Sequence, residues 1–174
     1  GNNLFNVTAS SLKFKNIIFS GITQTVDRSK FMDSKGKVTF ENCKFSGGNY
    51  RYYGIDANEV ILTNTVFEGI KYYYYLINAP ILSADNVSVI NNTYIGNGAQ
   101  NGFLQSQSVT SWNILNSNFE DNINLRIGLI YIKGNTLSHA NIKNTVFNSN
   151  ILLNSNGASQ SSCISTECNL NIDK

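Results

Sequence analysis

Two aspartates in successive segments of this chain are spaced for acid–base chemistry. Each follows a short strand-like run, and polar residues hold the same place in later segments: Asp33, Asp56, Asn78 and Gln105. If these runs are neighbouring strands of one sheet, Asp33 and Asp56 lie about 5 Å apart. Two carboxylates at that separation can divide their pKa values and act as acid and base, or as acid and nucleophile. The alternative is a solvated polar edge, because a catalytic pair also needs a shaped cleft and a cationic partner, for which Arg28 and Arg51 are the candidates.

Two tyrosine-rich segments hold the same register in consecutive repeats of the chain. They are Tyr50-Arg51-Tyr52-Tyr53 and Tyr72-Tyr73-Tyr74-Tyr75. Because alternate residues of a strand face opposite sides, about half of these rings should be exposed. Exposed tyrosines beside Arg51 and Lys71 would form a platform for sugar rings or for a protein partner. The alternative is that inward rings fill the core and outward rings only stack along the sheet.

Composition excludes several other functions. His139 is the only histidine, so neither an imidazole triad nor a histidine-based metal site can be assembled, and we expect no cofactor and no metal. Charged residues make up 14% of the chain, the net charge is +2, and the Lys and Arg residues are scattered, which argues against a nucleic-acid partner. No apolar run is long enough to span a membrane.

A repeated motif sets the frame that must position these residues. Six matches to the pattern N-x-x-[FY] recur at intervals of about 22 to 28 residues, which indicates a repeat architecture. Apolar residues stand five and seven positions before each aromatic, and a small or turn residue stands two positions after it. The asparagines are Asn16, Asn42, Asn64, Asn91, Asn116 and Asn144, and the aromatics are Phe19, Phe45, Phe67, Tyr94, Phe119 and Phe147.

Each repeat predicts a strand, a sharp corner at the asparagine, and a second strand. The alternation of apolar and polar residues before the asparagine is that of a half-buried strand. Asparagine tolerates the left-handed conformation that a corner requires. One repeat is too short to bury its apolar side, so the repeats must stack, with the asparagines in one column and the rings in another.

Two stacked folds fit such a period. A leucine-rich repeat also has an asparagine after a strand, but its spacing is one residue longer and a helix or 3₁₀ segment follows. Here no run with helical periodicity follows, and a second strand-like run appears, as in Leu129-Ile130-Tyr131-Ile132. We therefore predict an all-β fold, a right-handed parallel β-helix of about six coils with an asparagine ladder.

The repeat V-x-[FLI]-x-N-x-x-F-x-G/N resembles the right-handed β-helix, or pectin-lyase-like, superfamily. It is most similar to the Asn-rich repeats of large surface proteins and adhesins, over roughly residues 4–160. That superfamily includes polysaccharide lyases, hydrolases and non-enzymatic adhesins, so the resemblance implies fold more than activity. The paired aspartates, Gly-His-Gly and Arg-x-Lys of polygalacturonase-like members are absent as a set.

The ends and modification sites give further expectations. Residues 1–160 are expected to form one β-helix domain, and residues 161–174 a tail or a link to a following region, with the whole an excerpt of a longer chain. Cys163 and Cys168 could close a small disulfide loop. Sequons at Asn6, Asn86 and Asn91 fit a secreted glycoprotein. Asn86 is the better candidate, because a ladder position would occupy the amide of Asn91.

Together these observations predict a non-enzymatic extracellular or cell-surface module, structural or adhesive, that presents a rigid Tyr-rich face to a glycan or a protein. Open β-helix ends would also allow end-to-end self-association into a filament, or further coils of a longer chain. The alternative is a polysaccharide hydrolase or lyase that uses Asp33 and Asp56.

Overall fold

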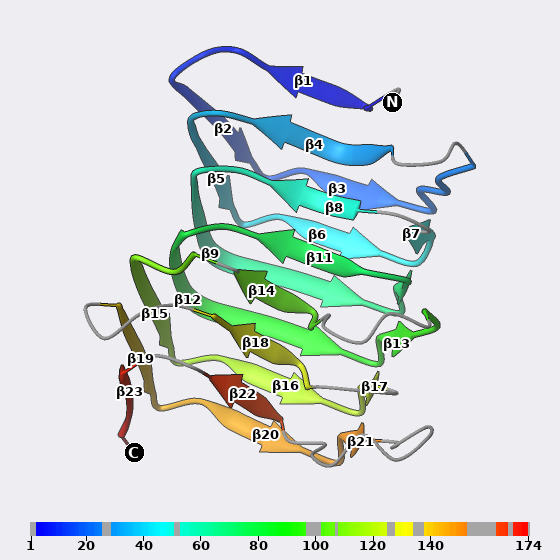
Figure 1. The fold of residues 1–174 in the computed structure, drawn as a ribbon. Helices are drawn as coiled ribbons and strands as arrows, with labels where there is room; N and C mark the ends of the chain where they lie inside the picture. Colours follow the sequence, from blue (N-terminus) through cyan, green and yellow to red (C-terminus); the bar gives the residue numbers. More distant parts are fainter. Residues whose placement is uncertain are drawn as a thin grey trace.

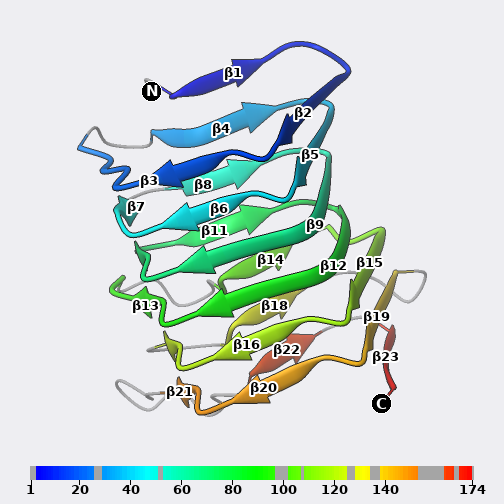
Figure 2. The ribbon, with the colours of Figure 1, turned by 180° about the vertical axis from the view of Figure 1, so that it is seen from behind.

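The computed structural model describes residues 3–25, 29–50, 53–96, 102–106, 108–124, 128–133, 138–152, 163–166 and 169–173. These residues form an all-β parallel solenoid of about five turns, close to the six coils that were predicted, and the described part of the chain contains no helix (Figure 1). Consequently none of it could cross a membrane as a helix. The chain winds right-handed from the N-terminal end to the C-terminal end (Figure 2).

Three parallel sheets line the solenoid. The first sheet contains β1 (Phe5–Val7), β4 (Lys30–Ser34), β8 (Tyr53–Asp56), β11 (Tyr75–Asn78), β14 (Leu104–Ser106), β18 (Ile130–Ile132) and β22 (Ile164–Thr166). The second contains β2 (Ser11–Lys15), β3 (Ile18–Ser20), β5 (Lys37–Glu41), β6 (Lys44–Ser46), β9 (Glu59–Glu68), β12 (Ile81–Ile90), β15 (Ser111–Leu115), β16 (Asn118–Glu120), β19 (His139–Lys143), β20 (Val146–Asn148) and β23 (Asn169–Asp173). The third contains β7 (Asn49–Tyr50), β10 (Lys71–Tyr72), β13 (Thr93–Tyr94), β17 (Ile123–Asn124) and β21 (Ile151–Leu152).

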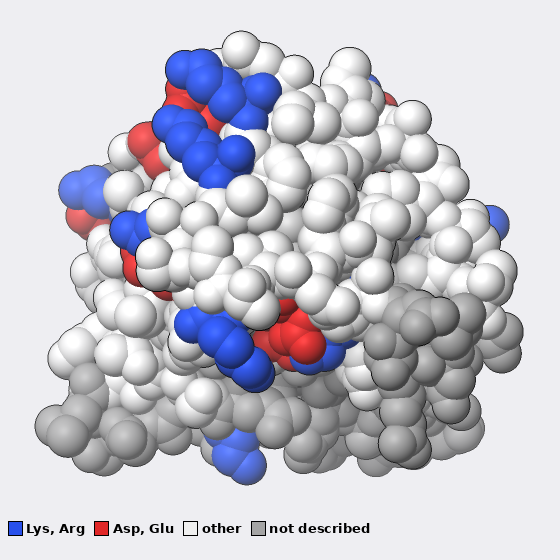
Figure 3. Space-filling view, turned by 90° about the horizontal axis from the view of Figure 1, so that it is seen from above, with Lys and Arg blue, Asp and Glu red and all other residues white. Residues whose placement is uncertain are grey.

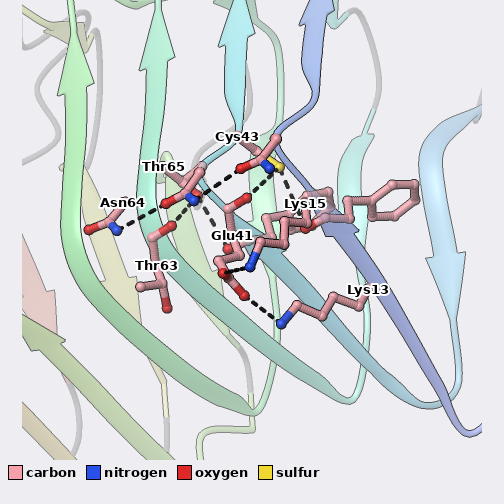
Figure 4. Close-up of polar contacts among 11 residues, drawn as sticks. Lys13, Lys15, Glu41, Cys43, Thr63, Asn64 and Thr65 are labelled. Atoms are coloured by element: carbon pink, nitrogen blue, oxygen red, sulfur yellow. Dashed lines mark hydrogen bonds and ion pairs between the residues drawn. The ribbon is translucent and has the colours of Figure 1, made fainter.

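The predicted asparagine ladder runs along a corner within the second sheet. Its members have φ between 49° and 58°, the left-handed region that asparagine tolerates. Asn42 Nδ2 donates to Asn16 Oδ1 at 3.0 Å, and Asn64 Nδ2 donates to Asn42 Oδ1 at 3.0 Å (Figure 4). Further along, Asn144 Nδ2 donates to Asn116 Oδ1 at 3.1 Å. The amide of each corner is thus bonded by the coil before or after it.

One predicted member of the ladder is wrong. Asn86, not Asn91, occupies this corner in its coil, and its Nδ2 donates to Asn64 Oδ1 at 2.8 Å. Asn91 lies at the next corner, in register with Gly69 and Asp121, with φ 55°. Both corners require a left-handed residue, so the motif Asn-x-x-aromatic fits either of them. The long pairing of β12 with β9 decides the register, because it directs Leu82, Ala84, Val87 and Val89 of β12 inward.

The same shift changes the predicted ring column. Phe19 stacks on Phe45 with ring centroids 4.7 Å apart, and Phe45 stacks on Phe67 at 4.8 Å. Val89, not Tyr94, comes next in this column, since Val89 pairs with Phe67 in the β9–β12 register. The column resumes with Phe119 and Phe147, whose centroids lie 4.9 Å apart. Tyr94 instead follows Tyr50 and Tyr72 in a buried column of the third sheet.

A second, buried asparagine ladder escaped prediction from the sequence. Asn92 Nδ2 donates to Asn122 Oδ1 at 3.0 Å, and Asn122 Nδ2 donates to Asn150 Oδ1 at 2.9 Å. The same amides donate to backbone carbonyls of the preceding coil, for example from Asn122 to Val89 O at 2.8 Å. Asn92 and Asn122 are almost completely buried. The ladder therefore satisfies backbone groups at a corner that water does not reach.

The solenoid continues past residue 160. β22 pairs with β18, and β23 pairs with β19, both in parallel. The segment expected to be a tail therefore adds strands to the same sheets. Cys163 has a free thiol, and burial raises its pKa. Its expected disulfide partner, Cys168, lies outside the described residues.

Replacing Asn64 with alanine tests the ladder. The change removes a donor to Asn42 and an acceptor for Asn86, and it places alanine at φ 49°. We expect the free energy of unfolding to fall by about 2–3 kcal/mol in urea denaturation. Asn64→Gly keeps the backbone conformation and loses only the amide bonds, so it should cost less, about 1 kcal/mol. Two variants as stable as the wild type would contradict a stabilising role for the ladder.

Gly54 tests how closely the strands of the first sheet approach. A Cβ at this position would clash with the carbonyl oxygen of Leu76 on the neighbouring strand β11. We expect Gly54→Ala to lower the free energy of unfolding by about 3 kcal/mol, because backbone atoms must move. Gly47→Ala is the matched control: its φ is +62° but nothing lies within 4 Å of the added carbon, so about 1 kcal/mol should be lost. Equal losses in thermal unfolding would refute the close approach.

Candidate functional site

Two consecutive residues point inward in the strands of the first sheet, and this determines which side chains face out. In β4, Phe31 and Met32 are both buried, so Lys30 and Asp33 on either side of them are both partly exposed. β8 repeats the arrangement, with Tyr53 and Asp56 facing out. Strand pairing places Tyr53 beside Lys30 and Asp56 beside Asp33.

The predicted polar row is confirmed by the strand register. Asp33 pairs with Asp56, Asp56 with Asn78, and Asn78 with Gln105, on the successive strands β4, β8, β11 and β14. Neighbours in the row are thus one strand spacing apart, about 4.8 Å. The row runs along the solenoid axis, with Asp33, Asp56 and Asn78 partly exposed on one outer face and Gln105 buried.

Lys30 is the cation that joins the two aspartates. Its Nζ lies 2.8 Å from Asp56 Oδ2 and 3.2 Å from Asp33 Oδ1. Burial acts to lower the pKa of Lys30, but the bonds to the two carboxylates outweigh this and raise it, so the ammonium stays charged. Arg28 and Arg51, the partners suggested by the sequence, lie outside the described residues. Lys30 was missed because simple alternation does not put it on the same face as Asp33.

Asp56 accepts two more hydrogen bonds, both from side chains of the neighbouring strand β11. Tyr75 Oη donates to Asp56 Oδ2 at 3.2 Å, and Asn78 Nδ2 donates to Asp56 Oδ1 at 3.1 Å. Burial and the nearby Asp56 carboxylate raise the pKa of Tyr75, so its phenol stays neutral. Asp56 is therefore the hub of the site.

The tyrosine segments divide between core and surface. Tyr53 packs against Tyr74 and against Tyr75, each with ring centroids 5.0 Å apart, and Tyr53 and Tyr74 are partly exposed. Tyr50 and Tyr72 were predicted as ligand-binding candidates, but they are 2% and 1% exposed and belong to the core. Burial raises the pKa of both.

The two-residue strands of the third sheet direct Tyr50 and Tyr72 inward. Each is the second residue of its strand, β7 or β10, where the first residue faces outward. Tyr73 is partly exposed but does not line the groove described below. Arg51 and Tyr52 lie outside the described residues.

The Asp56 carboxylate and the exposed tyrosines, predicted as separate features, share one open groove of about 550 Å³, whereas Asp33 does not line it. It is lined by Lys30, Tyr53, Asp56, Tyr74, Tyr75, Asn78, Pro80, Gln105, Ser106 and Ser108. Gln105 is only 3% exposed, and its Oε1 has no hydrogen-bond partner among the described residues. The groove thus combines aromatic rings, a charged hub and an unsatisfied buried acceptor.

Charged residues elsewhere form ion pairs on the surface. Seen from the N-terminal end, several described lysines lie beside Asp and Glu in small groups, with wide uncharged areas between them (Figure 3). Glu41 binds Lys13 and Lys15, and these bonds lower the pKa of Glu41 to about 2 (Figure 4). No group of His, Cys, Asp and Glu among the described residues could hold a metal ion.

The three sequons have exposed asparagines, but their settings differ from the prediction. Asn86 is the residue whose amide donates in the ladder, whereas Asn91 lies outside the ladder at the next corner. Asn6 accepts a hydrogen bond from Asn3 at 2.7 Å. A ladder position occupies the side-chain amide that a glycan would need. This argument, which favoured glycosylation of Asn86, therefore now favours Asn91.

Comparison with protein families, with curated proteins and with solved structures gives no match to this chain. The assignment to a parallel β-solenoid therefore rests on the strand pairing itself.

Proposed function

We propose that this chain is a non-enzymatic β-solenoid module that binds a glycan in the groove of the first sheet. The observation that carries the proposal is the placement of Tyr53 and Tyr74, partly exposed, beside the polar row of Asp56 and Asn78. Sugar rings have an apolar face that stacks on aromatic rings and hydroxyl groups that bond to carboxylates and amides. The groove offers both kinds of contact side by side.

The size of the groove favours a glycan over a protein partner. A stable protein–protein interface buries about 1,200–2,000 Å² in total and centres on well-packed anchors. The exposed rings here sit in a single depression of about 550 Å³ with a mostly polar lining. A short stretch of sugar units fits such a depression, and a protein partner remains an outcome of the binding test.

An extracellular or cell-surface setting, and a relation to pectin-lyase-like adhesins, are part of the same proposal. The exposed sequon asparagines and the Asn-rich repeat support them. Further coils of a longer chain, or self-association through the ends, would complete a structural role. Each described sheet ends in strands that are paired on one side only, such as β1 and β23, and unpaired strand edges favour added strands.

Alanine at Tyr53 tests the aromatic platform. A glycan screen would first identify a ligand, and isothermal titration calorimetry would then compare variants. We expect Tyr53→Ala to weaken binding about tenfold, or about 1.4 kcal/mol, through the loss of a stacked ring. Tyr73→Ala, which removes a partly exposed tyrosine outside the groove, should leave the dissociation constant unchanged. Equal effects of the two changes would place the ligand elsewhere.

The second candidate is a polysaccharide hydrolase or lyase, and one observation favours it: both aspartates converge on Lys30, which lines the groove with Asp56. Against it, Lys30, Tyr75 and Asn78 occupy the oxygens of Asp56, which leaves this carboxylate poorly placed to act on a substrate. The binding module accounts for these contacts better, because a fixed carboxylate holds the groove in shape.

Incubation with the bound glycan separates the two candidates. We expect the wild type to release neither new reducing ends nor unsaturated products, measured by a reducing-sugar assay and by ultraviolet absorbance. If products do form, and the double variant Asp33→Asn, Asp56→Asn abolishes them without loss of glycan affinity, the chain is an enzyme and the binding-module proposal is refuted.

A further inference from the structure

The principal hydrogen-bond donors of the groove are directed at one carboxylate. Lys30 Nζ, Tyr75 Oη and Asn78 Nδ2 contact Asp56 at 2.8, 3.2 and 3.1 Å. Their strongest interactions are therefore internal to the protein. A ligand that brings mainly acceptors would have to compete with Asp56 for them.

Hydrogen-bond acceptors, in contrast, remain available at both ends of the polar row, on Asp33 and Gln105. Gln105 Oε1 is buried and has no partner among the described residues. Asp33 bonds to Lys30 through Oδ1, and its side chain is 31% exposed. These two residues stand three strand spacings apart, about 14 Å. A buried acceptor without a donor is unfavourable, so the site gains most from a ligand that supplies N–H or O–H groups.

The charge of the groove points in the same direction. Of the described charged residues, Lys30 and Asp56 line it, and Asp33 binds Lys30 from just outside the lining. These three groups together carry one excess negative charge. Burial keeps the Tyr75 phenol neutral, and it therefore does not alter this balance. The faces of Tyr53 and Tyr74 carry negative electrostatic potential, which attracts cations.

We infer that the groove selects glycans with free, positively charged amino groups over neutral or acidic ones. This inference rests on the proposed glycan-binding function and specifies its ligand class. An ammonium group supplies donors for the leftover acceptors and neutralises the excess charge. An N-acetylated sugar keeps the ring and one N–H but has no charge, and a uronic acid adds a second negative charge beside Asp33 and Asp56.

The test compares three trisaccharides by isothermal titration calorimetry: β1,4-linked glucosamine, its N-acetylated form, and galacturonic acid. The buffer pH is chosen so that the amines are protonated while carboxylates are ionised. We expect the glucosamine trimer to bind at least about tenfold more tightly than the acetylated trimer, with the uronate weakest. Asp33→Asn should abolish most of this preference and leave binding of the acetylated trimer nearly unchanged.

Glu68→Gln is the matched control, because Glu68 also binds a lysine, Lys44 at 2.6 Å, but lies on the second sheet. It should leave the preference intact. Equal binding of the amino and acetylated trimers, or tightest binding of the uronate, would overturn the charge inference while glycan binding stands. If none of the trimers binds and a wider glycan screen also fails, the proposed function falls together with the inference.

Discussion

The fold depends on a corner that every coil must make at the same place. The backbone there has a positive φ, and an asparagine both tolerates that conformation and carries an amide that can bond to its neighbours above and below. An amide has donors and acceptors in equal measure, so a column of amides satisfies itself. The ladder therefore helps to hold the strands on either side of it in register, although it is interrupted where Asn116 donates to Asp85 instead of Asn86.

The register in turn assembles the groove. Strand pairing places Asp33 beside Asp56 and Lys30 beside Tyr53, although the loops that join these strands differ in length. Lys30 can bridge the two carboxylates only because the strands are aligned to the residue. A one-residue slip would send these side chains into the core and bring Phe31 or Met32 to the surface. The site is a consequence of stacking more than of any local motif.

The sequence contains enough to predict the fold class and the polar row. Periodic residues such as Phe45 and Val38 repeat a pattern that only stacked strands explain, and a row that follows one strand per coil needs no knowledge of the loops. The fourth coil was misplaced because Asn86 and Asn91 both suit a left-handed corner. Lys30 was missed because two adjacent inward residues break the alternation on which the prediction relied.

Other features depend on contacts that no single repeat contains. The burial of Tyr50 and Tyr72 follows from where short strands of the third sheet begin, and pattern alone does not locate those ends. The inner ladder can be recognised in the sequence only once the structure has located the corners. An asparagine then follows the second corner of three successive coils: Asn92, Asn122 and Asn150. Because polar residues are usually exposed, the composition gives no reason to predict a buried asparagine ladder.

The inner ladder and the outer row differ in how completely their polar groups satisfy one another. In the inner ladder every rung is an amide, donors match acceptors, and nothing is left for a ligand. In the outer row two rungs are carboxylates, which bring acceptors without donors, and Lys30 compensates for only one of the two charges. The row thus ends with an unmatched acceptor on Gln105 and an excess negative charge. The proposed binding site rests on this mismatch, because a ladder whose amides satisfy one another offers a ligand no unpaired group.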